Sequence, residues 1–409
     1  MPVSTSSMTA IHSPLSPHRL RQTLLANGPV ALLVMVILAL AGMGNGFVLQ
    51  LGTQILILWV FGLSYQLLFG RTGMLSFGHA VNFGLAAFVT AHAVRWLAGV
   101  WPVYEFLPLV GAIVGLTCGV VLGFPVTRRS GVAFAMVTLG LGELVAACFL
   151  MFPSFFGGEA GVTLQRTRVT SMLGIDYGRS GPQFLLTSAW ALAVVAAVRW
   201  LATTPLGLAT LAVRENPQRV EFLGYCTANV RWASCLAAST LAGVAGSLSA
   251  LAYEIVTVDA VSLHSSANVL LMTVIGGLGS AAGPLIGATF LTVMQSVVSE
   301  WTRAWLFYYG FIFVTLVWLA PDGIVGLWEK AGKRPRSKHW VAPFAGTLGF
   351  AVLLVIFIET AYQLAQGEPT HLPGWQSMPP AMLQGVLWGS GAAVSLWLAH
   401  FLRRQERTQ

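Results

Sequence analysis

Long apolar runs separated by short polar segments dominate this sequence of 409 residues. Charged residues make up only 9% of the chain, against about 25% in soluble domains. A transmembrane helix needs about 20 apolar residues. Runs of suitable length lie at 29–44, 46–69, 74–97, 104–126, 131–152, 183–201, 233–253, 268–298, 303–320, 343–363 and 381–402. The predicted fold class is therefore all-α, a polytopic integral membrane helical bundle.

The basic residues between these runs predict which side of the membrane each loop faces. Placing the clusters of arginine and lysine in the cytoplasm puts 17 of the 22 basic residues there, as the positive-inside rule requires. Both termini then lie in the cytoplasm. Because the net charge of +8 arises from these clusters, no nucleic-acid partner is predicted.

One run does not fit this topology as a single helix. Three runs lie between the cytoplasmic loop ending near Arg231 and the basic cluster starting at Lys330, although an even number of crossings is required. A helix over 268–298 would be about 46 Å long, whereas the apolar core is about 30 Å thick. We expect this run to break into two short helices at the glycine-rich stretch 276–284; a re-entrant segment at 254–267 is the alternative.

The N-terminal segment, residues 1–28, is predicted to be cytosolic. Basic residues, an apolar stretch from Val30 and Ala39-Leu40-Ala41 also fit a cleaved signal peptide. The long polar segment before them favours an uncleaved first helix.

The cytosolic loop 202–232 carries two helix-start signals and one stop signal. Thr204-Pro205 and Asn216-Pro217 each place a capping side chain before a proline, and Gly224 supplies a stop. Val220 and Leu223 should share one face of the short helix that follows Asn216. A helix this short is unstable alone, so it rests either on its own bundle or in a groove of a soluble partner.

The external loop 153–182 contains a glycine-rich stretch at 157–163. Its glycines permit close backbone approach, and Glu159 with Thr163 can meet a small ligand or an external partner. A simple turn between two helices explains the composition equally well.

Among the ionisable residues within predicted spans, His79 and Glu143 stand out. Such residues usually face the bundle interior and a solute path, which Ser76, Asn82, Thr138 and Gln295 are also placed to line. Polar residues in membrane helices also serve helix packing alone, at about 0.6 kcal/mol each.

The sequence lacks the motifs of several common enzyme classes. The sequence contains no G-x-x-x-x-G-K-[ST], HExxH or GxSxG motif, and its four cysteines form no CxxC pair. Nucleotide binding, hydrolysis and a zinc site are therefore not predicted for this chain.

An ordered series of motifs resembles the LivM-type permeases, the membrane subunits of branched-chain amino-acid ABC importers. The resemblance covers about residues 45–328. Its motifs are Leu75–Ala80 (LSFGHA), 131–139 with Gly142-Glu143-Leu144, 157–163, 204–207, 214–219 with Gly224, 268–279 with Gly283-Pro284, and 320–327.

The resemblance implies roles for particular residues. ATPase coupling is expected of Arg214, Glu215, Asn216, Arg219, Glu221 and Gly224. The translocation pathway is expected to include Ser76, His79, Thr138, Glu143, Gly276, Gly277 and Gly279. The external-loop site is expected at Gly158, Glu159, Gly161 and Thr163.

The resemblance also implies the partners. A second related permease, two ATP-binding subunits and a periplasmic or extracellular solute-binding protein are expected, in the plasma (inner) membrane of a bacterium. The chain itself needs no cofactor, because ATP and Mg belong to the ATP-binding subunits. The solute is a branched-chain amino acid or a relative such as urea, a short amide or an aromatic acid.

The predicted permease domain covers residues 29–327. A basic linker at 328–342 and a C-terminal two-helix membrane extension at 343–409 follow it, beyond the usual end of this family. Two other functional classes remain at this point. They are an ion- or proton-coupled secondary transporter working without ATPase subunits and a membrane-embedded enzyme using His79.

Overall fold

The computed structural model describes residues 44–97, 103–169, 171–301, 305–319 and 323–326. The predicted segment 1–28, nearly all of the run at 29–44, the linker 328–342 and the extension 343–409 lie outside the described residues, as does the alternative of a cleaved first helix.

Six helices in the described part of the chain are long and apolar enough to cross a membrane. They are α2 (Gly46–Tyr65, extended by a π-helical turn, Gln66–Gly70), α3 (Ala80–Leu97), α4 (Leu107–Val121, preceded by the 3-10 turn Tyr104–Phe106), α6 (Val132–Met151), α8 (Ser180–Thr203) and α11 (Thr227–Tyr253). The chain is therefore a multi-pass, all-α membrane protein, as predicted.

Shorter helices connect or flank these spans. They are α5 (Gly123–Val126), α7 (Pro153–Phe156), α9 (Pro205–Glu215), α10 (Pro217–Phe222), α12 (Leu263–Gly276), α13 (Gly283–Val293), α14 (Ser299–Trp301) and α15 (Trp305–Leu319). A π-helical turn, Met294–Val298, follows α13, and 3-10 turns cover Gly158–Ala160, Arg166–Arg168 and Val258–Ala260.

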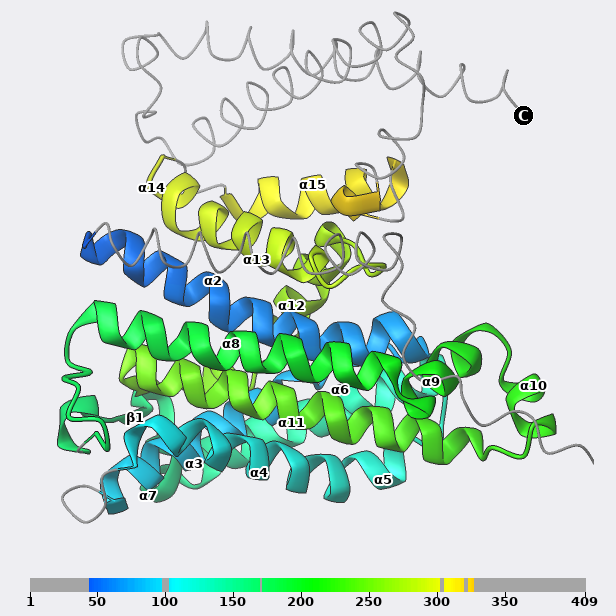
Figure 1. Ribbon diagram of the computed structural model, residues 1–409, viewed down its shortest axis with the longest axis horizontal. Helices are drawn as coiled ribbons and strands as arrows, with labels where there is room; N and C mark the ends of the chain where they lie inside the picture. The colour runs from blue at the N-terminus through cyan, green and yellow to red at the C-terminus, as the bar shows by residue number, and fades with distance from the viewer. Residues whose placement is uncertain (1–43, 98–102, 170, 302–304, 320–322, 327–409) are drawn as a thin grey trace, which may run out of the picture.

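The two ends of the bundle carry different structures. Helices α9 and α10 lie at one end, which we call the α10 end, and β1 lies at the other, the β1 end (Figure 1). There β1 (Val162–Thr163) pairs antiparallel with β2 (Ile255–Val256), with Val162 opposite Val256. This pair joins the start of α8 to the end of α11, because β1 precedes α8 and β2 follows α11.

The long run at 268–298 breaks where the glycine stretch predicted. Helix α12 ends at Gly276 and α13 begins at Gly283. The two pack so closely that a Cβ atom at Gly276 would lie 1.8 Å from the Gly283 carbonyl oxygen. The Gln66 amide donates to the carbonyls of Leu278 and Ser280, at 3.0 and 2.8 Å. The stretch 254–267, for which a re-entrant segment was the alternative, forms β2, a 3-10 turn and the start of α12; its re-entrant placement stays a prediction.

A second departure from the predicted spans lies at 74–97. Helix α3 begins only at Ala80, and residues 73–79 form an irregular segment instead. Gly73 has a φ of 73°, which favours glycine and interrupts the helix. Irregular backbone at membrane depth is tolerated only where it is buried in protein or lines a cavity. We therefore expect segment 73–79 to be buried in the bundle or to border a cavity.

Helices α4 and α11 approach one another through small residues at every fourth position. Gly111, Gly115 and Gly119 of α4 face Ser239, Gly243 and Ser247 of α11. A Cβ atom at Gly243 would lie 2.0 Å from the Gly111 carbonyl oxygen. Small residues with this spacing let membrane helices pack backbone against backbone, and this contact holds α11 in the centre of the bundle.

We expect Gly243→Val to destabilise the protein, because the valine side chain cannot fit against the α4 backbone. Overpacking of this kind costs about 1–3 kcal/mol or more. The melting temperature of the detergent-purified protein measures the effect. Gly140→Val is the matched control, since no atom lies within 4 Å of a Cβ atom at Gly140; equal melting temperatures for the two variants would contradict the packing argument.

Candidate functional site

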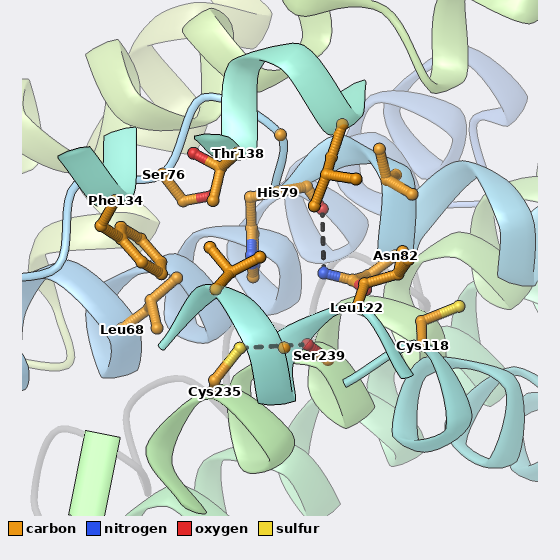
Figure 2. A pocket seen from close by; sticks show the side chains of 15 residues that line it. Leu68, Ser76, His79, Asn82, Cys118, Leu122, Phe134, Thr138, Cys235 and Ser239 are labelled. Carbon is orange, nitrogen blue, oxygen red and sulfur yellow. Dashed lines mark hydrogen bonds between the residues drawn. The ribbon is translucent and has the colours of Figure 1, made fainter. Parts of the chain in front are cut away.

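Segment 73–79 lines a cavity between α2, α3, α4, α6 and α11, which we call the central cavity (Figure 2). Its labelled lining residues are Leu68, Ser76, His79, Asn82, Cys118, Leu122, Phe134, Thr138, Cys235 and Ser239. The volume is about 50 Å³, and one water needs about 10–15 Å³. The cavity in this conformation therefore accommodates a few waters and has to widen to pass a solute.

His79 forms part of the cavity wall and is also tightly packed. Its side chain is buried, and its Nε2 lies 2.9 Å from the Ser64 hydroxyl. The ring stacks on Phe61, with centroids 5.6 Å apart, and meets Tyr65 edge-on at 5.5 Å. His79 is therefore packed in the bundle core and also lines the cavity; its part in a solute path stays a prediction.

Thr138 fastens segment 73–79 to α6. Its hydroxyl accepts a hydrogen bond from the Phe77 backbone N–H at 3.2 Å and donates to the Ala135 carbonyl at 2.9 Å. Gly78 makes the close approach possible, because a Cβ atom there would lie 2.1 Å from the Thr138 carbonyl oxygen. On the opposite side, the Tyr65 hydroxyl donates to the Ser76 carbonyl at 3.2 Å.

The structure brings together four of the polar residues that the sequence placed along a path, Ser76, His79, Asn82 and Thr138. Cys118, Cys235 and Ser239 also line the cavity, and the sequence reasoning did not assign them there. The spacing of Cys235 and Ser239, four positions apart on the small-residue face of α11, could have predicted that both side chains face the bundle interior.

Other predicted path residues lie elsewhere. Gln295 accepts a hydrogen bond from the Gln54 amide at 3.4 Å, away from the central cavity. None of the predicted glycines of the α12–α13 turn lines this cavity. Gly276 and Gly277 pack against neighbouring backbone, whereas a Cβ atom at Gly279 would have open space around it. Their part in the pathway stays a prediction.

The expectation that Glu143 faces the interior of this bundle is wrong. Its side chain is exposed on α6, because the buried face of that helix is made by Phe134, Ala135, Gly142 and Phe149. An ionisable side chain near the middle of an apolar helix is costly against lipid. This carboxyl therefore needs another polar surface or a water-filled path beside α6.

The capping signals of loop 202–232 are confirmed. The Thr204 hydroxyl accepts from the Gly207 N–H, and the Asn216 side chain accepts from the Arg219 N–H, each at 3.2 Å. Gly224 has a φ of 86°, the left-handed conformation expected of a helix stop. The predicted loop 202–232 is shorter than expected, because α11 already begins at Thr227.

The tip of this loop has one buried and one exposed part. Val220 is buried against Val213 and Val230, so α10 rests on its own bundle. The shared face predicted for Val220 and Leu223 is wrong, because α10 ends at Phe222 and Leu223 leaves the helical conformation. The side chains of Phe222, the last residue of α10, and Leu223, the residue after it, are 90% and 74% exposed.

Two arginines connect α9 to the end of α2. Arg214 donates to the Gly70 carbonyl at 2.5 Å, and Arg71 donates to the Gly207 carbonyl at 3.5 Å. Partial burial lowers the pKa of Arg71, but an arginine stays charged in proteins. Since Gly73 lies two residues after Arg71, these bonds link loop 202–232 to the start of segment 73–79.

The remaining predicted coupling residues have different surroundings. Glu221 accepts a hydrogen bond from the Thr227 hydroxyl at 2.8 Å and so ties α10 to α11. The side chains of Glu215 and Arg219 are exposed.

The glycines of loop 153–182, which was predicted to be external, serve backbone packing at the β1 end. Gly157, Gly158 and Gly161 all have positive φ. A Cβ atom at Gly161 would lie 2.2 Å from the Val256 carbonyl oxygen, so this turn is fitted against β2. Glu159 and Thr163 are exposed beside it.

We expect Thr138→Val to destabilise segment 73–79, because it leaves the Phe77 N–H without its acceptor. Such a loss costs about 1–3 kcal/mol, so both the melting temperature and solute uptake should fall. Thr138→Ser retains the hydroxyl and should behave like the native protein in both measurements. Normal solute uptake by Thr138→Val would contradict a functional role for the hydrogen bond between Thr138 and Phe77.

Comparisons with known proteins agree with this architecture. A family model described as a branched-chain amino acid transport system / permease component matches residues 47–320. Two similar proteins are high-affinity branched-chain amino acid transport system permease proteins LivM. That of Salmonella typhimurium is 27% identical and covers 68% of this chain and 69% of its own length. That of Escherichia coli is 26% identical and covers 72% of this chain and 74% of its own length. A probable branched-chain amino acid transport permease protein LivH of Methanocaldococcus jannaschii is 26% identical over 72% of this chain and 98% of its own. No solved structure matches the chain significantly. With more than half of its length matched, this chain belongs to the branched-chain amino acid transport system permease family.

Proposed function

We propose that this permease subunit carries a branched-chain amino acid, or a related small amphipathic solute, and that separate ATP-binding subunits drive it. The α10 end then lies in the cytoplasm with both termini, and the β1 end faces a solute-binding protein outside the plasma (inner) membrane of a bacterium. ATP and Mg are bound by the partner subunits. Membership of the family favours this function over an ion- or proton-coupled transporter.

The observation that carries the proposal is the exposed apolar tip of the loop. Phe222 and Leu223 stand at the end of a short helix that is capped and anchored on its own bundle through Val220. A large aromatic side chain 90% exposed outside the membrane spans is well suited to fill a pocket of another protein. An ATP-binding subunit is the partner we assign to it.

A continuous set of contacts leads from this tip to the central cavity. Helix α10 follows α9, and the Arg214 and Arg71 bonds join α9 to the end of α2. Segment 73–79 begins there and reaches the cavity at Ser76 and His79. A shift of the cytosolic loop on ATP binding would thereby act on the cavity wall and shift the population between its closed and open forms.

The exposed carboxyl of Glu143 supports a second permease chain. Because it is costly against lipid, we propose that the face of α6 around Glu143 meets the related subunit, with the solute path nearby. The cavity of one chain would then form half of the complete pathway.

We expect Phe222→Ala to weaken the binding of the ATP-binding subunits. Truncating a buried aromatic anchor costs about 2 kcal/mol or more, which corresponds to a roughly 30-fold loss in affinity. Co-purification of the subunits and solute-stimulated ATP hydrolysis measure the loss. Phe47→Ala is the matched control, because Phe47 is 57% exposed at the start of α2, the opposite end of that helix from the α9 contacts. Unchanged co-purification and hydrolysis for Phe222→Ala would sink the docking assignment.

We expect Glu143→Leu to leave the isolated chain as stable as the native one, since it removes a carboxyl that has no buried role there. Assembly with the second permease or solute uptake should instead fall at least about tenfold, a loss of roughly 1.4 kcal/mol. Leu185→Ala, at an exposed residue of α8 outside this face of α6, serves as the control. Native levels of both assembly and uptake in Glu143→Leu would contradict a role for this face.

A further inference from the structure

A second cavity lies at the β1 end, and we call it the β1 pocket. It has a volume of about 110 Å³ and is formed by the first turns of α2 and α8, the end of α11 and the 3-10 turn after β1. Six polar side chains line it: Gln50, Thr53, Arg166, Ser180, Gln183 and Tyr253. None of these residues lines the central cavity, so the β1 pocket is a separate site.

Gln183 carries an unused hydrogen-bond donor in this pocket. Its side chain is only 2% exposed, and its Oε1 accepts from the Tyr104 hydroxyl at 2.9 Å. Its Nε2 is buried and has no hydrogen-bond partner among the described residues. Buried polar groups are nearly always paired, so each exception calls for an explanation.

Arg166 brings a fixed positive charge to the same pocket. Its Nε lies 3.4 Å from Glu254 Oε1, and one terminal nitrogen donates to the Gly178 carbonyl at 3.0 Å. Glu254 is itself held by the Arg166 backbone N–H at 3.0 Å. A guanidinium has five N–H donors, and these two contacts leave donor capacity for a ligand.

The geometry points to the β1 pocket as an external binding site for the carboxylate of a small solute, with Arg166 and Gln183 as its donors. A carboxylate accepts at both oxygens, and hydrogen bonds from a guanidinium to it are among the strongest in proteins. The ligand would give the Gln183 amide the acceptor that the chain does not supply.

This inference rests on the proposed function for the side of the membrane and deepens it by naming the solute class. A carboxylate site is suited to amino acids and other small carboxylic acids and gives no reason for selecting urea or a neutral amide. Phosphate offers similar acceptor oxygens. The test therefore has to distinguish binding of a carboxylate from binding of free phosphate or of a lipid phosphate group.

The test uses the full chain in maltoside micelles, without partner subunits or ATP, and follows ligand-induced shifts of the melting temperature. A ligand that binds only the folded protein stabilises it in proportion to the logarithm of its concentration over Kd. L-leucine and isovalerate, which both carry a carboxylate, should raise the melting temperature. Leucinamide, in which an amide replaces the carboxylate, should not.

Gln183→Glu is the decisive variant, because it keeps an oxygen for the Tyr104 hydroxyl and places a negative charge where the carboxylate would bind. It should weaken the affinity for leucine and isovalerate at least about tenfold. Gln165→Glu adds the same charge to an exposed residue of the same segment and should leave the affinity unchanged.

Four results would overturn the assignment: no shift with any carboxylate, an equal shift with leucinamide, native affinity in Gln183→Glu, or a shift with inorganic phosphate or phosphatidylglycerol alone. Failure here is distinguishable from failure of the proposed function. Binding in micelles does not involve the ATP-binding subunits, whereas the Phe222→Ala experiment does not depend on the β1 pocket.

Discussion

The irregular segment 73–79 exists inside the bundle only because side chains of neighbouring helices bind its main chain. Backbone groups at membrane depth have no water to bind, so each needs a partner within the protein. The hydroxyls of Tyr65 and Thr138 supply two of these partners from opposite sides. The central cavity, the position of His79 and the late start of α3 all follow from this one arrangement.

The same arrangement relates the central cavity to loop 202–232. Segment 73–79 begins where Arg71 and Arg214 bind carbonyls across the α2–α9 contact, and it ends at the cavity wall. Helices α2 and α3 flank this short stretch, whose main chain is free of the helical hydrogen-bond pattern, so it can change conformation without unwinding either helix. A permease needs such an element, because its pathway has to open without dissolving the bundle.

Much of the fold could be predicted from the sequence, because its physical causes are local. Run length predicted the long spans, glycine and proline predicted the break between α12 and α13, and two threonine- or asparagine-proline pairs predicted the caps of α9 and α10. Each of these signals acts within a few residues.

What escaped prediction depends on contacts between distant segments. The non-helical start of the run at 74–97 requires Thr138, about 60 residues away. The exposure of Glu143 depends on which face of α6 meets the other helices, and a nearly uniform apolar helix carries little information about its own orientation. The β1 pocket joins residues of α2, α8 and α11 that no sequence motif connects.

The pairing of β1 with β2 has a mechanical consequence for the helices between them. Strand β2 begins two residues after α11 ends, and β1 belongs to the loop before α8. The strand pair therefore fixes the end of α11 at the β1 end, and α10 lies near the opposite end of this helix. Helix α11 has 27 residues and is therefore about 40 Å long. A displacement of about 3 Å at its far end corresponds to a tilt of only about 4°, so the strand pair can stay closed while the α10 end moves.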